Sequence, residues 1–287
     1  MIEFLQVDVF AQDAYRGNQL AVFPDAGGLS GAQMQAIATE MNLSETAFVL
    51  SHSDDSYEVR IFTPAEELPF AGHPTLGTAW VLKHLGLLRA DTITQNSPAG
   101  PTRVWAAGDS LWFERTGAAQ ADLASTSIDS DQKMARMLNL QLSQIGMEAR
   151  EIGRSGRLRP AYSDAGLLHL MVPLRDLEAL RDVRVDTALV AEHPTGGVYC
   201  FTGEAAGAIR ARGIFPSFGI AEDPATGSAA ACLGVYLADR LGSIELDVRQ
   251  GVEMGRPSRL MVKAEPGRVE VGGNCCLIFK GELITLP

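Results

Sequence analysis

The sequence predicts an α/β (α+β) protein built from two similar domains, and two observations carry that prediction. Strand-like and helix-like patterns alternate along nearly the whole chain. A seven-residue motif that begins at His73 recurs without gaps at Asp223, at an offset of 150 residues. A chain of 287 residues is long enough for two ordinary domains. Two copies half a chain apart indicate two similar domains related by a pseudo-twofold axis, whereas a solenoid needs shorter periods and at least three copies.

Hydrophobic periodicity and turn residues place the elements in order. Ser30 is a favourable N-cap for the first helix. Helices are expected over 31–41, from Pro74 onward, over 132–140 and over 224–241. Strands are expected over 4–10, 20–23, 46–50, 57–62, 110–114, 166–172, 197–202, 259–264, 268–271 and 275–279. The polar stretch 117–131 is a candidate linker. The expected domains are 1–117 and 118–287, with 278–287 as a candidate strand that returns to the first.

Composition excludes several classes of protein. The chain carries 24 Lys+Arg against 35 Asp+Glu, a net charge of −11 without a basic tract, so a nucleic-acid partner is not expected. No apolar run approaches the ~18 residues of a membrane helix, and the N-terminus resembles no signal peptide. Four cysteines lack C-x-x-C or zinc-ligand spacing. We therefore expect a cytoplasmic, metal-free protein, with Cys275 and Cys276 as reduced, buried thiols.

The repeated motif predicts a distinctive helix start. Each copy places Pro where the first helical residue is expected, so that His73 and Asp223 would be the N-caps. Small residues follow, and they leave the N–H groups of the first turn approachable at the positive end of the helix dipole. Two such helix starts could hold a small carboxylate. The alternative is that both are core helices whose glycines permit close packing.

Glu45 is the next candidate, because it stands where a helix ends and an apolar strand begins. Partial desolvation there would raise its pKa and suit a general acid/base. The alternative is a solvated carboxylate at a strand edge. Asn18 lies in a turn and suits a ligand hydrogen bond, whereas His52, His84, His169 and His193 are interpreted as surface or core residues. The signatures of nucleotide-binding loops, serine hydrolases and zinc proteases are absent from the sequence.

Taken together, these motifs are similar to those of a known family. The segments are 7–10 with Gly17-Asn18, 42–46, 70–75, 222–229, Gln250-Gly251 and 255–257. In this order, and over nearly the whole chain, they resemble the PhzF phenazine-biosynthesis-like proteins. One departure is Gln19, where family members commonly have Pro. The resemblance implies a diaminopimelate-epimerase-like fold, in which two similar domains each curl a mixed sheet around a central helix and share a site in the cleft between them.

The resemblance also implies an activity. It is the cofactor-independent isomerisation of trans-2,3-dihydro-3-hydroxyanthranilate, in which Glu45 moves a proton between carbons and His73 and Asp223 assist. It further implies no metal and no cofactor, a small carboxylate substrate, no nucleic-acid or membrane partner, and a homodimer. The substrate contacts that it implies are Asn18, Gly72, Thr75, Gly227 and Ser228.

Two other functions stay open from the sequence. Relatives of this fold that racemise amino acids use paired cysteines at the two helix starts, and neither helix start here carries a thiol. An epimerase or racemase acting at the same site is therefore the alternative among enzymes. A catalytically idle protein that binds a metabolite or a protein partner is the alternative from another class.

Overall fold

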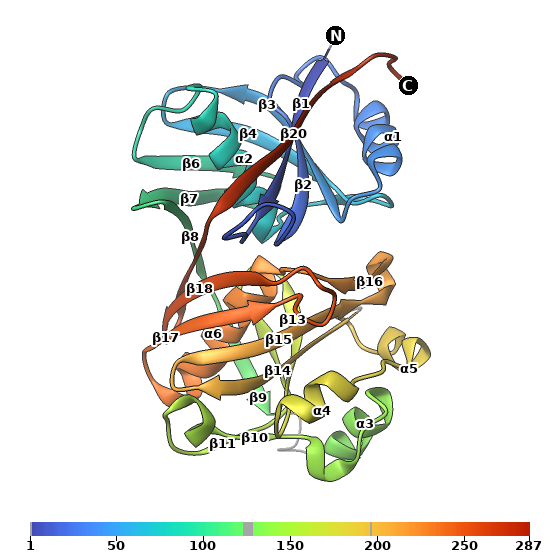
Figure 1. Ribbon diagram of the computed structural model, residues 1–287, viewed down its shortest axis with the longest axis vertical. Coiled ribbons are helices and arrows are strands. Elements are labelled where there is room, and N and C mark those ends of the chain that lie inside the picture. The colour runs from blue at the N-terminus through green and yellow to red at the C-terminus, as the bar shows by residue number, and fades with distance from the viewer. Residues whose placement is uncertain (1, 123–128, 196) are drawn as a thin grey trace. The chain divides into compact units, whose positions relative to one another are not determined.

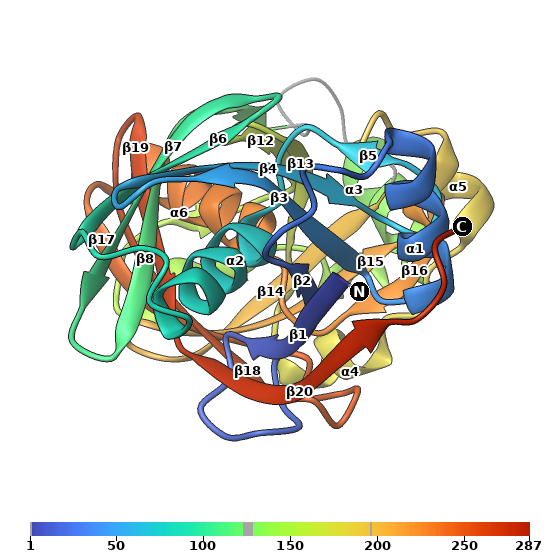
Figure 2. The same ribbon diagram turned by 90° about the horizontal axis from the view of Figure 1, so that it is seen from above.

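The computed structural model describes residues 2–122, 129–195 and 197–287, and its chain divides into two compact units. The first unit comprises residues 1–114 and 272–287, and the second comprises 115–271. The second unit is thus inserted between the bulk of the first unit and its last strand. Each unit is a mixed sheet with one helix packed against its inner face and shorter helices outside (Figures 1 and 2).

The first unit is a mixed sheet in the order β20-β1-β2-β3-β4-β6-β7-β8. β1 is antiparallel to β20 and β2, β2 is parallel to β3, and β4 is parallel to β6. The short β5 pairs with the end of β4. The strands are β1 (Ile2–Val9), β2 (Asn18–Phe23), β3 (Glu45–His52), β4 (Ser56–Phe62), β5 (Glu67–Leu68), β6 (Thr92–Ser97), β7 (Gly100–Ala107), β8 (Ser110–Thr116) and β20 (Cys275–Leu283). The helices are α1 (Gly31–Met41) and α2 (Gly72–His84).

The second unit repeats this pairing pattern over seven strands, in the order β9-β12-β13-β14-β15-β17-β18. β12 is antiparallel to β9 and β13, β13 is parallel to β14, and β15 is parallel to β17, with the short β16 paired to β15. Its main strands are β9 (Ala118–Asp122), β12 (Ala161–Asp164), β13 (Leu168–Pro173), β14 (Val198–Ala205), β15 (Ala208–Phe215), β16 (Ile220–Asp223), β17 (Ile244–Gln250), β18 (Ser258–Glu265) and β19 (Arg268–Gly273). A separate hairpin joins β10 (Met147–Glu148) to β11 (Arg157–Leu158). The helices are α3 (Asp129–Met137), α4 (Leu177–Asp182), α5 (Thr187–Ala191) and α6 (Gly227–Leu241). The repeated topology confirms the prediction of two similar domains.

The central helix of each unit is buried on nearly every side. In α2 all residues from Gly72 to Ala79 are buried, and in α6 all residues from Gly227 to Ala238 are buried. α2 packs against β1, β2, β3, β6 and β7, and α6 packs against β9, β12, β13, β17 and β18. A helix without a polar face is stable only inside a core. The sheet must therefore curve around it, and this confirms a curled mixed sheet around a central helix.

The outer helices have a different construction. α1 begins after Ser30, as predicted, and a capping box with Gln33 holds its first turn. It packs over β2, β3 and β4 through a cluster that includes Met34, Ile37 and Phe48. In the second unit α3, α4 and α5 cover the outer face of the sheet with a second apolar cluster.

Two predictions about local structure are wrong. Residues 118–122 of the expected linker form β9, which pairs with β12, and α3 begins at Asp129; the rest of that stretch, 123–128, lies outside the described residues. Cys275 and Cys276 are free thiols, as predicted, but they are only partly buried. Cys200 and Cys232 are the buried thiols.

Two helix glycines set how closely the sheets approach the central helices. A Cβ on Gly77 would lie 2.7 Å from Val9 Cγ2 and 2.5 Å from Leu20 Cδ2. A Cβ on Gly234 would lie 2.7 Å from Val262 Cγ1. All three distances are too short for a real methyl group. The close packing of helix against sheet that the sequence offered for the motif glycine is therefore confirmed at Gly77.

We expect Gly77→Ala and Gly234→Ala each to lower the free energy of unfolding by about 1–3 kcal/mol, despite the better helix propensity of alanine, because the added methyl overpacks the core. Chemical denaturation measures the loss. Gly28→Ala is the control, since that position is exposed with open space around it, and its effect should stay within about 0.5 kcal/mol. A stabilised Gly77→Ala would contradict the close packing.

Candidate functional site

Three predicted residues of the first unit, Asn18, Glu45 and His73, lie next to one another together with Ser44. Ser44 Oγ donates to Asn18 Oδ1 at 3.0 Å, and Asn18 Nδ2 lies 3.2 Å from His73 Nδ1. On the other side of the ring, His73 Nε2 lies 3.4 Å from Glu45 Oε2. Asn18 begins β2, Glu45 begins the neighbouring β3, and His73 is in the first turn of α2. The parallel pair β2–β3, with Leu20 opposite Glu45, brings these residues to one end of the sheet.

Burial determines the charge of this group. Glu45 is 9% exposed and His73 is 3% exposed, so Glu45 is not the solvated strand-edge carboxylate of the alternative reading. Desolvation lowers the pKa of His73 to about 3, against a weaker opposing effect of the Gln19 backbone. The ring is therefore neutral near pH 7. The ring places Nδ1 beside the Asn18 amide and Nε2 toward the Glu45 carboxylate.

The start of α2 corrects one prediction. The helix begins at Gly72 and its N-cap is Ala71, so His73 is the second helical residue and Pro74 the third. Pro is tolerated there because a first-turn N–H needs no intrahelical partner. The Thr75 hydroxyl donates to Ala71 O and accepts from Gln95 Nε2, and Thr75 is fully buried. Contact of Thr75 with a substrate stays a prediction, which this internal bonding does not favour.

The start of α6 differs from that of α2, and the predicted N-cap is wrong here too. Asp223 ends β16, and the helix begins only at Gly227, after Thr226 as N-cap. The buried Gln250 side chain donates to Asp223 O at 2.7 Å and to Thr226 Oγ1 at 2.9 Å. Its Oε1 accepts from Thr226 N and from Tyr199 OH. These bonds keep residues 223–226 out of the helix, so that Pro224 lies before α6 rather than in its first turn.

Asp223 itself is 5% exposed, and its Oδ2 accepts from Thr226 Oγ1 at 2.5 Å. β16, the strand that carries Asp223, is also held through Glu222, whose carboxylate makes a bidentate pair with Arg212. The loop and its carboxylate are therefore fixed by their surroundings before any ligand binds.

His169 is a functional candidate that sequence reasoning missed. It lies in β13, is 3% exposed, and its Nε2 is 3.0 Å from Ser228 Oγ in the first turn of α6. Desolvation lowers its pKa to about 4, so this ring is also neutral near pH 7. The residues are 59 positions apart, and no local pattern connects them.

Both central helices begin without a side-chain cap, whereas α1, α4 and α5 are capped by Ser30, Asp176 and Asp186. The first-turn N–H groups at Gly72 and Gly227 thus keep the open, positive character predicted for a carboxylate ligand. This matches the small-residue pattern of the motif, although the capping residues differ from those expected.

Neither central helix carries a thiol in its first turn. Cys232 is the sixth residue of α6, where its Sγ donates to Leu167 O and burial raises the thiol pKa.

Within the described ranges no group of three or more His, Cys, Asp or Glu is arranged to hold a metal ion. None of the helices described combines the length and the apolar character needed to cross a bilayer.

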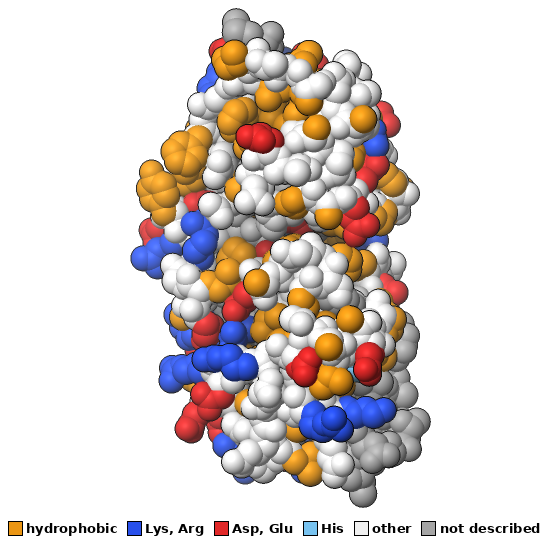
Figure 3. Space-filling model, turned by 90° about the vertical axis from the view of Figure 1, so that its right-hand side faces the viewer, with side chains coloured by type: hydrophobic (Ala, Val, Ile, Leu, Met, Phe, Trp, Pro, Cys, Tyr) orange, Lys and Arg blue, Asp and Glu red, His pale blue; other side chains and the backbone are white. Residues whose placement is uncertain are grey.

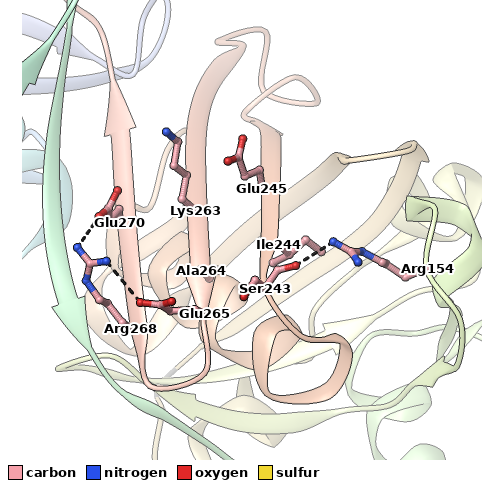
Figure 4. A pocket seen from close by; sticks show the side chains of 9 residues that line it. All are labelled: Arg154, Ser243, Ile244, Glu245, Lys263, Ala264, Glu265, Arg268 and Glu270. Atoms are coloured by element: carbon pink, nitrogen blue, oxygen red, sulfur yellow. Dashed lines mark hydrogen bonds and ion pairs between the residues drawn. The ribbon is translucent and has the colours of Figure 1, made fainter.

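An open hollow of about 530 Å³ lies on the second unit, over β17, β18 and β19 (Figure 4). Arg268 pairs there with Glu265 and Glu270, and Arg154 donates to Ser243 O. Its rim is exposed charge, and it contains none of the predicted site residues. Basic and acidic side chains also lie in small separate groups on the face shown in Figure 3, without a continuous basic surface there.

The two buried histidines predict how stability depends on pH. Below pH 6.5 the unfolded chain binds protons that neutral His73 and His169 do not, so the free energy of unfolding falls as the pH falls from about 6.5 toward 4. Each histidine should contribute a loss of about 2 kcal/mol between pH 7.5 and pH 5. Denaturation at both pH values should show a smaller loss in His73→Gln and in His169→Gln. The exposed His52→Gln is the control, and an unchanged loss in both test variants would contradict neutral burial.

Comparison with known proteins places this geometry in a family. The model of the phenazine biosynthesis-like proteins (PhzC-PhzF) matches residues 7–281. A trans-2,3-dihydro-3-hydroxyanthranilate isomerase of Pseudomonas aeruginosa is 36% identical over 295 residues, which cover 98% of this chain and 99% of that protein.

Solved structures agree. A predicted epimerase of Pseudomonas aeruginosa has a TM-score of 0.79 and 31% identity, covering 99% of this chain and 100% of that one. A probable proline racemase of Agrobacterium radiobacter shares the fold alone, with a TM-score of 0.63 at 12% identity over 99% of this chain and 93% of that one. The chain therefore belongs to the phenazine biosynthesis-like (PhzC-PhzF) family, and it is an isomerase.

Proposed function

We propose that this isomerase moves a proton within a small carboxylate substrate of the trans-2,3-dihydro-3-hydroxyanthranilate class, with Glu45 as the general acid/base. One observation carries the proposal: in the first unit the buried Glu45 carboxylate faces a neutral imidazole. The matching position at the start of β14 is the apolar Val198. The relative at 36% identity is named for this reaction, and it supports the choice of substrate.

In the proposed reaction Glu45 takes a proton from a carbon of the substrate, and the electron pair of the broken C–H bond enters the conjugated system. The protonated Glu45 then returns the proton to a different carbon, so that the double bonds shift and atoms and electrons balance. A single carboxylate suffices for both steps, provided that it stays beside the ring between them.

His73 and Asn18 support Glu45 in this scheme. In the tautomer protonated at Nε2, neutral His73 would point its ring proton toward Glu45 Oε2, 3.4 Å away, and would stabilise the carboxylate without adding a charge. Asn18 fixes the ring through Nδ1, and Ser44 fixes Asn18. We therefore assign Asn18 as a positioning residue.

We propose that Asp223 completes the catalytic set and that the helix starts bind the substrate. The uncapped N–H groups at Gly72 and Gly227, together with the Ser228 hydroxyl, suit a carboxylate. Asp223 already has a geometry fixed by Thr226 and can accept a hydrogen bond from an amino or hydroxyl group of the substrate. Epimerisation by paired bases is the second candidate, and the absence of a thiol from the first turns of α2 and α6 argues against it.

We also propose that the enzyme acts as a homodimer in the cytoplasm, without a nucleic-acid or membrane partner. Four unpaired cysteines agree with a reducing compartment. The net charge of −11 opposes binding to phosphate backbones and to anionic lipids.

Glu45→Gln should lower turnover by at least about a thousandfold, because the amide cannot accept and return a proton. Turnover is measured by mass spectrometry as deuterium uptake from D₂O into trans-2,3-dihydro-3-hydroxyanthranilate. The melting temperature should change little, since the amide keeps the shape of the carboxylate. Glu40→Gln is the control, on the exposed face of α1. A Glu45→Gln enzyme as active as its parent would remove Glu45 from the mechanism.

Asp223→Asn should lower kcat by about a hundredfold while the fold is retained, because the amide oxygen still accepts from Thr226. Steady-state kinetics and thermal melting are compared with the exposed Asp182→Asn. Equal melting and full activity would show that Asp223 only shapes the loop.

The position of the label separates the candidate functions. Isomerisation places deuterium on a carbon that carried no exchangeable proton in the substrate and changes the ultraviolet spectrum as the double bonds move. Epimerisation places deuterium on the original carbon and inverts its configuration. The absence of uptake into any carboxylate of the panel would favour an idle binding protein.

A further inference from the structure

The surroundings of the buried His169–Ser228 pair in the second unit determine which of the two residues donates the hydrogen bond between them. The two atoms in contact, His169 Nε2 and Ser228 Oγ, are 3.0 Å apart, and either could be the donor. The other ring nitrogen, Nδ1, is fully buried, and among the described residues no protein group is within hydrogen-bond reach of it. The aromatic ring of Phe215 packs edge-on against the imidazole at a centroid distance of 5.5 Å.

Two neutral tautomers are therefore in competition. If Ser228 donated to Nε2, the ring proton would be on Nδ1, as a buried N–H without an acceptor. If Nε2–H donates to Ser228, only a lone pair on Nδ1 is left unsatisfied. Orphaned buried N–H groups are rarer and more costly in proteins than under-satisfied acceptors. The second tautomer is favoured, and the hydroxyl of Ser228 must then direct its own proton away from the ring.

Ser228 stands where a donor is useful. It is the second residue of α6, a helix of 15 residues whose first turn lacks a side-chain cap. A hydroxyl proton there adds to the N–H groups that converge on an anion at a helix start. An accepting hydroxyl at the same place would repel a carboxylate.

We propose that His169 is a positioning residue that donates from Nε2 to Ser228, so that Ser228 donates its hydroxyl proton to a carboxylate oxygen of the substrate at the start of α6. This rests on the proposed function for the identity of the substrate. The direction of the His169–Ser228 hydrogen bond does not depend on the proposed function, because it follows from residues of the second unit alone.

The tautomer is measured directly, without substrate. In protein labelled with ¹⁵N-histidine, long-range ¹H–¹⁵N correlation at pH 7 distinguishes protonated from unprotonated ring nitrogens, and the His169 signals are assigned by their loss in His169→Gln. We expect a neutral ring protonated at Nε2. A ring protonated at Nδ1, or on both nitrogens, would overturn the proposal.

Kinetics test the consequence. His169→Leu should raise KM for trans-2,3-dihydro-3-hydroxyanthranilate at least about tenfold and leave kcat within about threefold. Without His169, Ser228 is no longer held as a donor and loses its hydrogen bond to the charged carboxylate of the bound substrate. His169→Gln should restore most of the affinity, since its amide can donate from near the Nε2 position. In a Ser228→Ala background, His169→Leu should change KM no further. Additive effects of the two substitutions would assign His169 a purely structural role and overturn the proposal.

A matched control and a binding assay keep this result separate from the proposed function. His193→Leu removes another histidine–hydroxyl pair of the same unit, with Tyr162, and should leave KM unchanged. Binding of 3-hydroxyanthranilate, the aromatic analogue, is measured by calorimetry in every variant. If the parent binds it in a His169-dependent way but turns over no substrate, the proposed reaction fails and the role of His169 stands. If neither binding nor turnover is seen, the ¹⁵N measurement still decides the direction of the His169–Ser228 hydrogen bond.

Discussion

Burial of a helix on every side is the constraint from which the rest of each unit follows. α2 and α6 present small or apolar side chains all round, so the sheet has to curve about them, and Gly77 and Gly234 set how closely it approaches. The same burial brings the first turn of each helix into a dry environment. There an uncapped N–H or a carboxylate interacts more strongly with a charged ligand than it would in water. The site is thus a consequence of the core rather than an addition to it.

The same three residue types brace both helix starts. In the first unit Tyr57 donates to Gln95, which donates to Thr75, and in the second unit Tyr199, Gln250 and Thr226 are linked in the same way. Fully satisfied buried networks of this kind define one conformation. The two units share this Tyr–Gln–Thr network but differ in the side chains beside it. The first unit holds Glu45 and His73, and the second holds Asp223, His169 and Ser228.

Local sequence signals were sufficient for some features and insufficient for others. The bounds of α1 followed from Ser30 and helical periodicity, and the internal repeat anticipated two domains with the same strand order. The true starts of α2 and α6 could not be found in this way, because Gln250, 24 residues beyond Thr226, holds the second loop extended. β6 was missed because its inward-facing Gln95 breaks the apolar alternation, and β15 because Arg210 and Arg212 are buried. His169 likewise became visible only beside Ser228.

The insertion of the second unit within the first has a consequence for biosynthesis. β20 pairs with β1 along its length, from Ile2 opposite Leu283 to Val9 opposite Cys275, and these are strands from opposite ends of the chain. During translation β1 leaves the ribosome well before this neighbour does. Residues 115–271 lie between the two strands in the chain and can fold while the first unit still lacks β20. Vectorial synthesis therefore favours maturation of the unit that holds Asp223 before the unit that holds Glu45.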